Sequence, residues 1–273
     1  MTALVGQESG ELVPFSPTAD RVSSVVRNLP AVDLPSLDAG AALLTRVDRK
    51  YVVPLATFER LVRTLGDDWS ALEISGSRLF GYSSVYFDTP DLLTYRAHLQ
   101  RRRRRYKVRV RRYVDSDDCM LEVKTKGMRG RTVKERQPHA TWQQSDLGED
   151  GRRFVVDCLH AHGVPPVSAF VPVVATSNRR ATLTSLTDTA RLTVDTDLTC
   201  GWGGLTTTLR PGHVVLESKV EGHASSADRI LRAMGERPAA ISKYCLGVAS
   251  LGLDVPTNPW RRTLRTFFDT PHT

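Results

Sequence analysis

The feature that most constrains the fold is a strict alternation of charged and apolar residues within short segments rich in β-branched residues. The segment KVRVRRY at 107–113 places Lys107, Arg109 and Arg111 at every second position, with valines between them. Successive side chains of a strand point to opposite faces, so these three cations share one face. The segment LEVKTK at 121–126 repeats the pattern, with Glu122 and Lys124 opposite its apolar residues. Both segments are therefore predicted strands with one charged face.

Two further segments show the same alternation. Glu217, Lys219 and Glu221 share a face in one, and Arg46, Asp48 and Lys50 share a face in the other. A single strand of this kind usually turns its polar face to solvent. Four such strands whose charged faces mix both signs favour another arrangement, a closed antiparallel barrel of about eight strands around a basic tunnel. The sequence alone does not decide which face points inward.

The remaining patterns predict an α+β fold that is mainly β, with peripheral helices. Strands are expected at Arg46–Val53, Leu79–Asp88, Tyr106–Tyr113, Met120–Lys126, Arg131–Gln137, Val171–Leu183, Ala190–Leu198 and Val214–Glu221. Helices are expected at Thr57–Leu65, Leu92–Leu99, Arg153–His162, Ala227–Met234 and Lys243–Leu251. We expect a loosely ordered leader at 1–38, with at most one short helix, one domain at 39–253, and a tail at 254–273.

Positive charge is concentrated in one part of the chain. The 38 Lys and Arg against 30 Asp and Glu give a net charge of +8, and residues 101–112 (RRRRRYKVRVRR) contain nine basic residues and no acid. Such a density of cations indicates a polyanionic partner, because the cations attract phosphate and repel one another without it. A solvated charge run or a nucleic-acid patch remains an alternative for this segment.

Cysteine usage and hydropathy point to the cytoplasm. The four cysteines are widely spaced without a CxxC pair, which is typical of reduced thiols rather than of a zinc site or a disulfide framework. No stretch reaches the roughly 18 apolar residues of a membrane span, and the first 30 residues lack the basic and apolar regions of a signal peptide. We therefore expect a cytoplasmic protein without a membrane span.

A set of motifs in a fixed order resembles a known family. The motifs are Arg46-x-Asp48-x-Lys50-Tyr51, Tyr86-Phe87-Asp88-Thr89-Pro90, Lys107-x-Arg109-x-Arg111-x-Tyr113, Glu122-x-Lys124, Asn178-Arg179-Arg180-Ala181, Arg191-Leu192-Thr193-Val194-Asp195, Leu216-Glu217-Ser218-Lys219 and Ser242-Lys243-Tyr244. Together they resemble the VTC domain, the polyphosphate polymerase branch of the CYTH or triphosphate tunnel metalloenzyme superfamily. The resemblance spans roughly residues 40–252.

The resemblance implies an eight-stranded tunnel that transfers the terminal phosphoryl group of ATP to a growing polyphosphate chain with Mn²⁺ or Mg²⁺. The implied catalytic residues are Lys50, Arg109, Arg111 and Lys124. Further phosphate-binding residues are Lys107, Lys134, Arg179, Arg191, Lys219 and Lys243. Glu217, helped by Glu122, is the implied metal ligand. These residue types suit phosphoryl transfer, which depends on positioning and charge neutralisation more than on covalent chemistry.

The chain departs from other branches of that superfamily at its first strand. Those branches open with ExExK, whereas Arg46 and Asp48 stand at the two glutamate positions here. Fewer metal-binding carboxylates favour the polymerase over a triphosphatase or an adenylate cyclase. The membrane spans and the phosphate-sensing SPX domain that accompany the domain in eukaryotic proteins have no counterpart here, and a membrane partner cannot be read from the sequence.

Two other functions stay open. A metal-dependent triphosphatase would use the same tunnel with water as the acceptor, and a non-catalytic module would bind polyphosphate or nucleic acid. Glu217 among cations favours catalysis, because a carboxylate weakens polyanion binding unless it holds a metal. Nucleic acid is not expected, since the basic strands lack aromatic residues at stacking positions. Arg101–Arg105 are expected around the tunnel entrance or in solvent, where they would steer the substrate.

Overall fold

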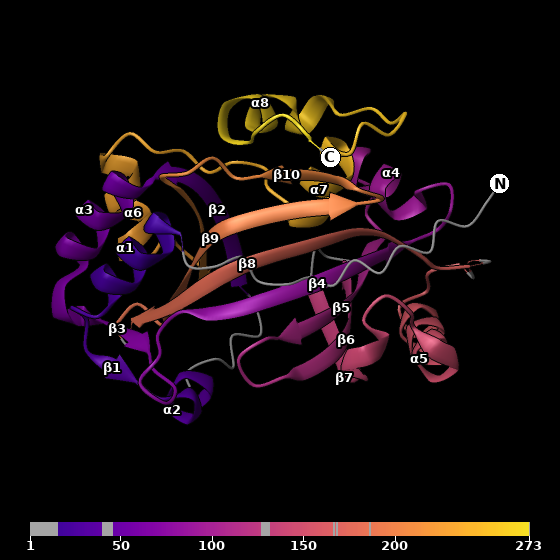
Figure 1. Ribbon diagram of the computed structural model, residues 1–273. Helices are drawn as coiled ribbons and strands as arrows, with labels where there is room; N and C mark the ends of the chain where they lie inside the picture. The colour runs from indigo at the N-terminus through magenta and orange to yellow at the C-terminus, as the bar shows by residue number, and fades with distance from the viewer. Residues whose placement is uncertain are drawn as a thin grey trace.

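The alternating segments assemble into one sheet of eleven strands, in which the main path runs β2-β11-β9-β8-β4-β5-β6-β7 and neighbours on it are antiparallel. β3 pairs with β8 and, in parallel, with β1, and β10 pairs with β9. Figure 1 shows the long strands β9, β8 and β4 lying side by side at the centre of the molecule. The computed structural model describes residues 16–39, 46–126, 132–165, 167, 169–185 and 187–272.

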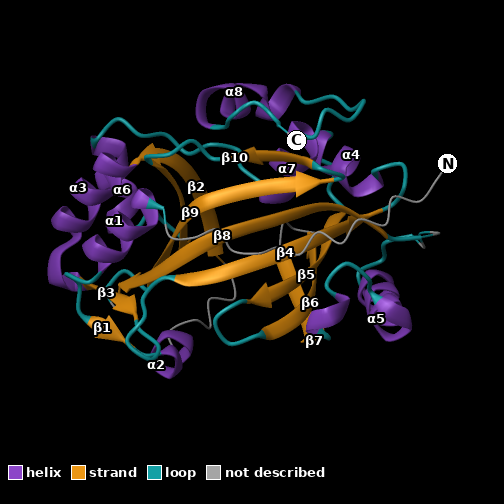
Figure 2. Ribbon diagram, in the orientation of Figure 1, coloured by secondary structure: helices purple, strands orange, loops and turns teal. Residues whose placement is uncertain are grey.

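The elements of these described residues have the following bounds. The strands are β1 (Ala31–Val32), β2 (Arg46–Pro54), β3 (Trp69–Leu72), β4 (Phe80–Asp88), β5 (Arg105–Tyr113), β6 (Asp118–Lys126), β7 (Thr132–Pro138), β8 (Val171–Ser185), β9 (Ala190–Trp202), β10 (Leu205–Thr208) and β11 (His213–Glu221). The helices are α1 (Pro17–Val26), α2 (Leu34–Ala39), α3 (Leu55–Leu65), α4 (Leu93–Leu99), α5 (Gly148–Ala161), α6 (Ser226–Ala233), α7 (Lys243–Ser250) and α8 (Asn258–Phe267), with short 3₁₀ turns at Gly66–Asp68 and Thr141–Gln143. Figure 2 shows the helices around the sheet.

The sheet is not closed, so the prediction of a closed barrel of about eight strands is wrong. β2 and β7 end the strand path, and no ladder joins them within the described residues. Alternation tells which residues share a face, but it carries no information on whether the two outermost strands hydrogen bond to each other. The sheet is nevertheless curled, because Lys124 on β6 approaches Asp48 on β2 to 3.7 Å although these strands lie near opposite ends of the path. We call the face that carries both side chains the concave face.

One layer of helices covers the convex face over β2, β11, β9 and β8. α1, α3 and α6 pack there on alternate strand residues, among them the fully buried Leu192, Val194 and Leu216. Figure 1 places these three helices together at the left of the view. α1 lies within the predicted leader and begins at Pro17 after Ser16, whose hydroxyl accepts from the backbone N–H of Ala19. Residues 1–15 of that leader lie outside the described residues, and the domain boundaries stay predictions.

Helices at the other end of the sheet form two further hydrophobic clusters. α5 covers the outer side of β5 and β6, where it packs on Val108 and Leu121. α7 packs on Val174 of β8 and Cys200 of β9, so it covers one end of the concave face. α8 packs behind α7 through Trp260, which is buried beside Tyr95 of α4 at a ring distance of 5.3 Å. α8 lies within the predicted tail.

All eight predicted strands and all five predicted helices are confirmed, with shifted ends. The sequence patterns missed α2, α8, β1, β3 and β10, which are short or lie in segments that we expected to be loosely ordered. Arg131, the expected start of one strand, lies outside the described residues, and β7 begins at Thr132. None of the described helices combines the length and the apolar character that crossing a membrane would require.

Candidate active site on the concave face

The concave face is built first from a row of cations on β5. Lys107 donates to the hydroxyl of Ser242 at the start of α7, 2.7 Å away. Arg109 donates from Nε to the carboxylate of Glu122 on β6 at 2.6 Å. Because β5 is a regular strand, both cations point to the same side, and the valines between them enter the core beneath α5. The predicted sharing of this face is confirmed.

Arg111 continues this row in a less polar setting. Its Nε lies 3.4 Å from the hydroxyl of Ser84, and its guanidinium lies over the ring of Tyr82 at 5.2 Å from the centroid. The same ring is approached by the guanidinium of Arg180 at 5.3 Å. Burial, together with the neighbouring charge of Arg109, lowers the pKa of Arg111. Within the described residues, this guanidinium has no carboxylate partner of its own.

Glu122 supports cations from two strands at once. Its carboxylate forms ion pairs with Arg109 and with Lys134 on β7, and its side chain is only 2% exposed. Burial alone would raise the pKa of Glu122, but Arg109, Arg111 and Lys134 hold it well below its usual range. The buried carboxylate is therefore ionised and fixes the two cations above it.

Glu217 on β11, like Glu122 on β6, is a carboxylate that is ion-paired with two cations. It forms ion pairs with Lys50, its direct partner on β2, and with Lys219, whose Nζ lies 3.4 Å away. Burial would raise the pKa of this carboxyl, but Lys219 and Lys50 hold it well below its usual range. Lys124 and Asp48 then connect β6 with β2. Side chains thus complete a ring of charges that the backbone ladder leaves open.

A third carboxylate, Asp195 on β9, organises the far side of the concave face. It binds Arg180 through both oxygens, at 2.6 and 2.8 Å, and accepts from the amide of Asn178 at 3.1 Å. The ammonium of Lys243 from α7 lies 2.8 Å from the same carboxylate and also bonds to Asn178. α7 begins at Lys243 because Ser242 caps the helix by accepting from the backbone N–H of Cys245. The cap therefore places an ammonium beside the cations of the sheet.

Burial makes several of these ammonium groups weaker bases than free lysine. It lowers the pKa of Lys107, Lys124 and Lys134, and nearby cations add to the effect. Burial and the charges of Arg180 and Arg111 lower the pKa of Lys243 to about 7, although Asp195 opposes the change. Positive charge is therefore packed more densely here than the carboxylates compensate.

Two carboxylates of this face lie deeper than its most exposed cations. The side chains of Glu122 and Asp195 are 2% and 3% exposed, whereas Lys124 is 45% and Lys134 38% exposed. An approaching anion would thus meet these two ammonium groups first. The buried carboxylates would hold the neighbouring cations in place. Around Glu217 the depths are mixed, because Glu217 is 14%, Lys219 16% and Asp48 24% exposed.

Most predicted site residues lie on the concave face. They are Lys50, Lys107, Arg109, Arg111, Glu122, Lys124, Lys134, Glu217, Lys219 and Lys243, and Arg191 shares the face in register with Lys219. Arg191 is turned toward α2, where it donates to the carbonyl of Leu37 at 2.9 Å. Arg179 is not brought together with this set, because it follows Asn178 on β8 and belongs to the opposite face.

The prediction from sequence left three residues of the concave face out of the site, namely Arg180, Asp195 and their partner Asn178. Arg180 and Asp195 stand directly opposite each other on β8 and β9. Both occur in the motifs that carried the family resemblance, but β8 has polar residues on both faces, so alternation does not choose between Arg179 and Arg180. The useful signal was the spacing of two between Asn178 and Arg180, which places them on one face.

The donor set suits a divalent cation that is shared with a phosphate ligand. No group of three or more His, Cys, Asp or Glu side chains lies together in the part of the chain that the structure describes. Glu217 is an ionised carboxylate, and its ladder partner Thr193 has a buried hydroxyl without a hydrogen-bond partner there. Mg²⁺ and Mn²⁺ accept one or two protein oxygens together with water and phosphate. Both Glu217 and Glu122 are ion-paired with two cations, but Glu217 is the more accessible of the two, with a side chain 14% exposed against 2% for Glu122.

Comparison with protein families identifies the domain. The sequence profile described as the VTC domain matches residues 45–252, most of the chain. The chain belongs to the VTC domain family. This membership supports a CYTH-like enzyme that handles triphosphates. No curated protein sequence matches the chain at a significant level.

Solved structures show more distant similarity to this VTC domain protein. HpAC1 from Hippeastrum, a candidate adenylyl cyclase with a dominant triphosphatase activity, aligns with a TM-score of 0.47 and 14% identity, covering 77% of this chain and 98% of that chain. The PH1819 protein from Pyrococcus horikoshii aligns with a TM-score of 0.43 and 14% identity, covering 74% and 97%. Similarity at this level does not show that two proteins share an activity, so the triphosphatase activity is a property of HpAC1 only.

Proposed function

We propose that this VTC domain protein is an ATP:polyphosphate phosphotransferase. The observation that carries the proposal is the density of cations on the concave face, several of which are held by the ionised carboxylates of Glu122, Asp195 and Glu217. A chain of phosphates would bind along Lys107, Arg109 and Arg111, at intervals of about 7 Å along β5. Membership in the VTC domain family supports a triphosphate ligand. For the proposed reaction, the concave face would bind ATP as the phosphoryl donor and polyphosphate as the acceptor at the same time.

In the proposed reaction, protein side chains position and neutralise but do not form covalent bonds. An oxygen of the terminal phosphate of the acceptor chain attacks the γ-phosphorus of ATP, and the bond from that phosphorus to the β–γ bridging oxygen breaks. ADP leaves with the bonding electrons, and the chain grows by one phosphate. Arg109, Arg111, Lys50 and Lys124 neutralise the charge on the transferring group and on the leaving oxygen. Lys107, Lys134, Arg180, Lys219 and Lys243 bind the flanking phosphates.

A divalent cation belongs to the proposal. Glu217 would hold Mg²⁺ or Mn²⁺, with the Thr193 hydroxyl beside it. When bound, the ion would neutralise phosphate oxygens and so add to the stabilisation that the cationic side chains supply. The ionised state of Glu217, maintained by Lys50 and Lys219, is the property of the protein that this role requires.

A metal-dependent triphosphatase is the second candidate. It is favoured by the open path of the sheet, because a face without a β2–β7 ladder in the described part of the chain admits water to the phosphates. A module that only binds polyphosphate would use the same cations. The three functions differ in the fate of the γ-phosphoryl group.

Product analysis distinguishes these functions. The purified protein is incubated with ATP and Mn²⁺, and chain polyphosphate, orthophosphate and ADP are resolved. Long chains with ADP support the transferase, orthophosphate without chains supports the triphosphatase, and polyphosphate binding without turnover leaves the binding module. Arg111→Ala is the variant to compare with the natural sequence. Within the described residues Arg111 forms no ion pair with a carboxylate, so its removal leaves no buried carboxylate without a partner. We expect it to lower ATP turnover by about 100-fold, as for loss of one transition-state donor. Unchanged turnover would remove Arg111 from the catalytic set.

A further inference from the structure

The five consecutive arginines before β5 form an anchored loop rather than a free run of charge. In this arginine loop (Arg101–Arg105), Arg102 donates its backbone N–H to the carbonyl of Ala97 in α4 at 2.9 Å. The guanidinium of Arg105 in turn binds the carbonyl of Arg102 at 2.7 Å. These bonds tie the loop to the end of α4 and to the start of β5. The backbone that carries the exposed guanidinium groups is therefore held in place by hydrogen bonds.

The arginine loop continues the cationic row of the concave face. Arg105 precedes Lys107 by two positions on β5 and so shares its face. Burial lowers the pKa of Lys107, and the charges of Lys50, Arg109 and Arg105 add to the effect. Directly opposite Arg105 on β6 stands Lys126, and directly opposite Lys107 stands Lys124. Like charges placed opposite each other in a ladder destabilise it. Two successive rows of this kind are explained by an anion that lies over both.

The loop end of this row lacks compensating acids. Within the described residues, no carboxylate pairs with Arg105, Lys126 or the exposed Arg101, Arg102 and Arg103. From Arg105 to Arg111 the alternate positions of β5 extend over about 20 Å. A triphosphate reaches over only part of that length, and a longer chain of phosphates reaches over all of it.

We infer that the arginine loop, with Arg105 and Lys126, is a subsite for the distal part of a polyphosphate chain whose terminal phosphates lie among Lys107, Arg109 and Arg111. The inference rests on the proposed function and names the part of the site that distinguishes a long chain from a short one. Electrostatic attraction to several phosphates in succession supplies the affinity, and the anchored backbone keeps the cations in line with the strand.

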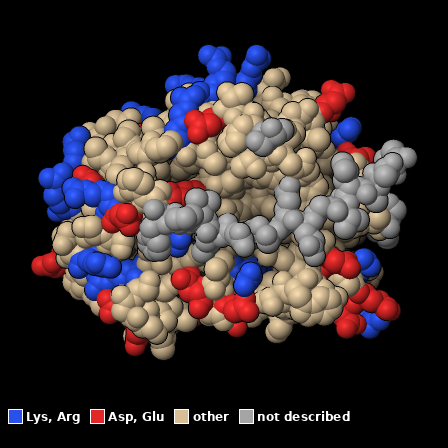
Figure 3. Space-filling view, in the orientation of Figure 1, with Lys and Arg blue, Asp and Glu red and all other residues tan. Residues whose placement is uncertain are grey.

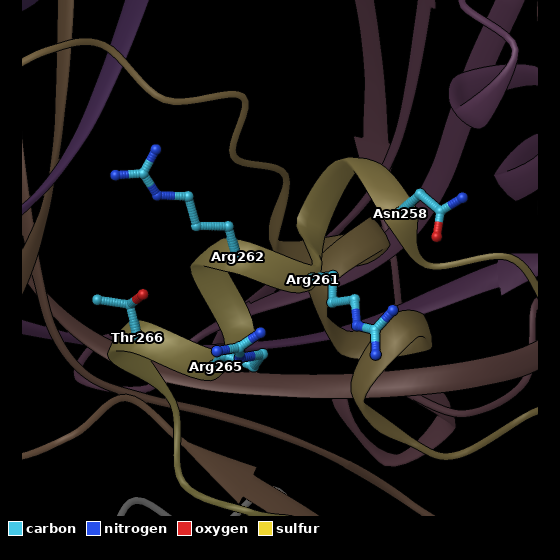
Figure 4. Close-up of a pocket in the computed structure, with 5 residues that line it drawn as sticks. All are labelled: Asn258, Arg261, Arg262, Arg265 and Thr266. Carbon is cyan, nitrogen blue, oxygen red and sulfur yellow. The ribbon is translucent and has the colours of Figure 1, made fainter.

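The chain offers a matched control on another element. α8 presents three exposed arginines, Arg261, Arg262 and Arg265, around a surface hollow that Asn258 and Thr266 also line (Figure 4). Figure 3 shows basic side chains gathered at the top of the molecule, over α8. These arginines also have no carboxylate partner within the described residues, but they follow the VTC match and lie on no strand of the concave face. Removing them changes the net charge as much as removing three loop arginines does.

The test compares two ligands on two triple variants of the full chain. R101Q/R102Q/R103Q removes three exposed loop cations but keeps Arg104, which bonds to the carbonyl of Gly163, and Arg105. R261Q/R262Q/R265Q is the control, and thermal unfolding checks that both fold. We expect the loop variant to bind long-chain polyphosphate about tenfold more weakly, from three pairings worth about 0.5 kcal/mol each, and tripolyphosphate nearly as the natural sequence does. The control should bind both ligands within about twofold of the natural sequence.

Each other result overturns the inference. Equal losses in the two triple variants would show a general effect of net charge, and equal losses for the two ligands would place the loop at the terminal phosphates. Salt dependence of the natural sequence gives a second measurement, because a chain that contacts more cations has a steeper slope of affinity against salt. Equal slopes for the two ligands would contradict the subsite. Failure of the natural sequence to bind either ligand would instead refute the proposed function itself.

Discussion

Lys243 is the residue whose charge state depends most closely on the assembly of the site. Its ammonium is buried at the start of α7 between Asp195, which stabilises its charge, and Arg180 and Arg111, which oppose it. The resulting pKa of about 7 means that the group is half charged near neutral pH. A bound phosphate would favour the charged form, so anion binding and proton uptake are coupled at this residue.

This coupling predicts pH-dependent binding. The charged form of Lys243 predominates at pH values well below its pKa of about 7 and is lost as the pH rises through that value. We expect the affinity of the natural sequence for tripolyphosphate to fall about tenfold from pH 6 to pH 8 through this group, one pH unit on either side of the pKa. Calorimetry in two buffers with different ionisation enthalpies measures the proton uptake. Lys243→Arg keeps the charge at both pH values and removes this component, while titration of the ligand contributes equally to both proteins. Identical pH profiles would contradict the prediction.

Asp195 is predicted to stabilise the fold as well as the site. Asp195→Asn would leave Arg180 and Lys243 close together without their carboxylate, and breaking a buried ion pair in this way costs about 3–5 kcal/mol. The free energy of unfolding by guanidinium measures the loss. Asp67→Asn is the control, because Asp67 is exposed and its replacement should change stability by less than about 0.5 kcal/mol. Equal effects of the two substitutions would show that Asp195 does not organise the cluster.

At the scale of elements, one glycine sets the position of α7. A Cβ at Gly247 would lie 2.7 Å from Cγ2 of Val174 and 3.3 Å from Cβ of Cys200, closer than side chains normally approach. The helix therefore packs on β8 and β9 at a distance that only glycine permits. Because Lys243 is at the beginning of the same helix, the closeness of this contact controls how far its ammonium reaches over the concave face.

Gly247→Ala tests this dependence. We expect overpacking to reduce the free energy of unfolding by about 1–3 kcal/mol and to weaken tripolyphosphate binding as Lys243 shifts. Val174→Ala removes the atom that the new methyl group would meet, so the double variant should regain part of the lost affinity. The measurements are thermal unfolding and calorimetric titration of all four combinations. Additive effects of the two substitutions would show that the contact does not position α7.

The alternation of charged and apolar residues predicted those features of the site that depend on one strand alone. It placed Lys107, Arg109 and Arg111 on one face correctly, because β5 has a clear apolar face. It could not choose between Arg179 and Arg180, because β8 is polar on both sides. Closure of the sheet depends on whether β2 and β7 meet, which is decided by curvature and loops rather than by the pattern of either strand. The ion pair between Lys124 and Asp48 likewise joins residues that no local pattern connects.

At the scale of the whole molecule, the concave face combines a stable frame with uncompensated charge. Hydrophobic clusters on the convex face hold the strands, while Lys107, Lys124 and Lys134 stand in register across three strands of the concave face. Neighbouring like charges in register reduce the stability of the ligand-free protein. A bound polyanion would remove this repulsion, so we expect ligand binding and folding stability to be strongly linked.

The linkage predicts a large thermal shift. A ligand that binds only the folded protein at 100 times its Kd adds about 2.7 kcal/mol of stability, which corresponds to a rise in Tm of about 5–10 °C for a chain of this size. We expect tripolyphosphate to produce this rise, and sulfate at the same ionic strength to produce much less, because a single tetrahedral anion cannot lie over several cations in succession. Arg111→Ala should reduce the shift without abolishing folding, since this guanidinium bonds only weakly to Ser84. Equal shifts with sulfate and tripolyphosphate would mean that the concave face responds to ionic strength alone and does not recognise a chain of phosphates.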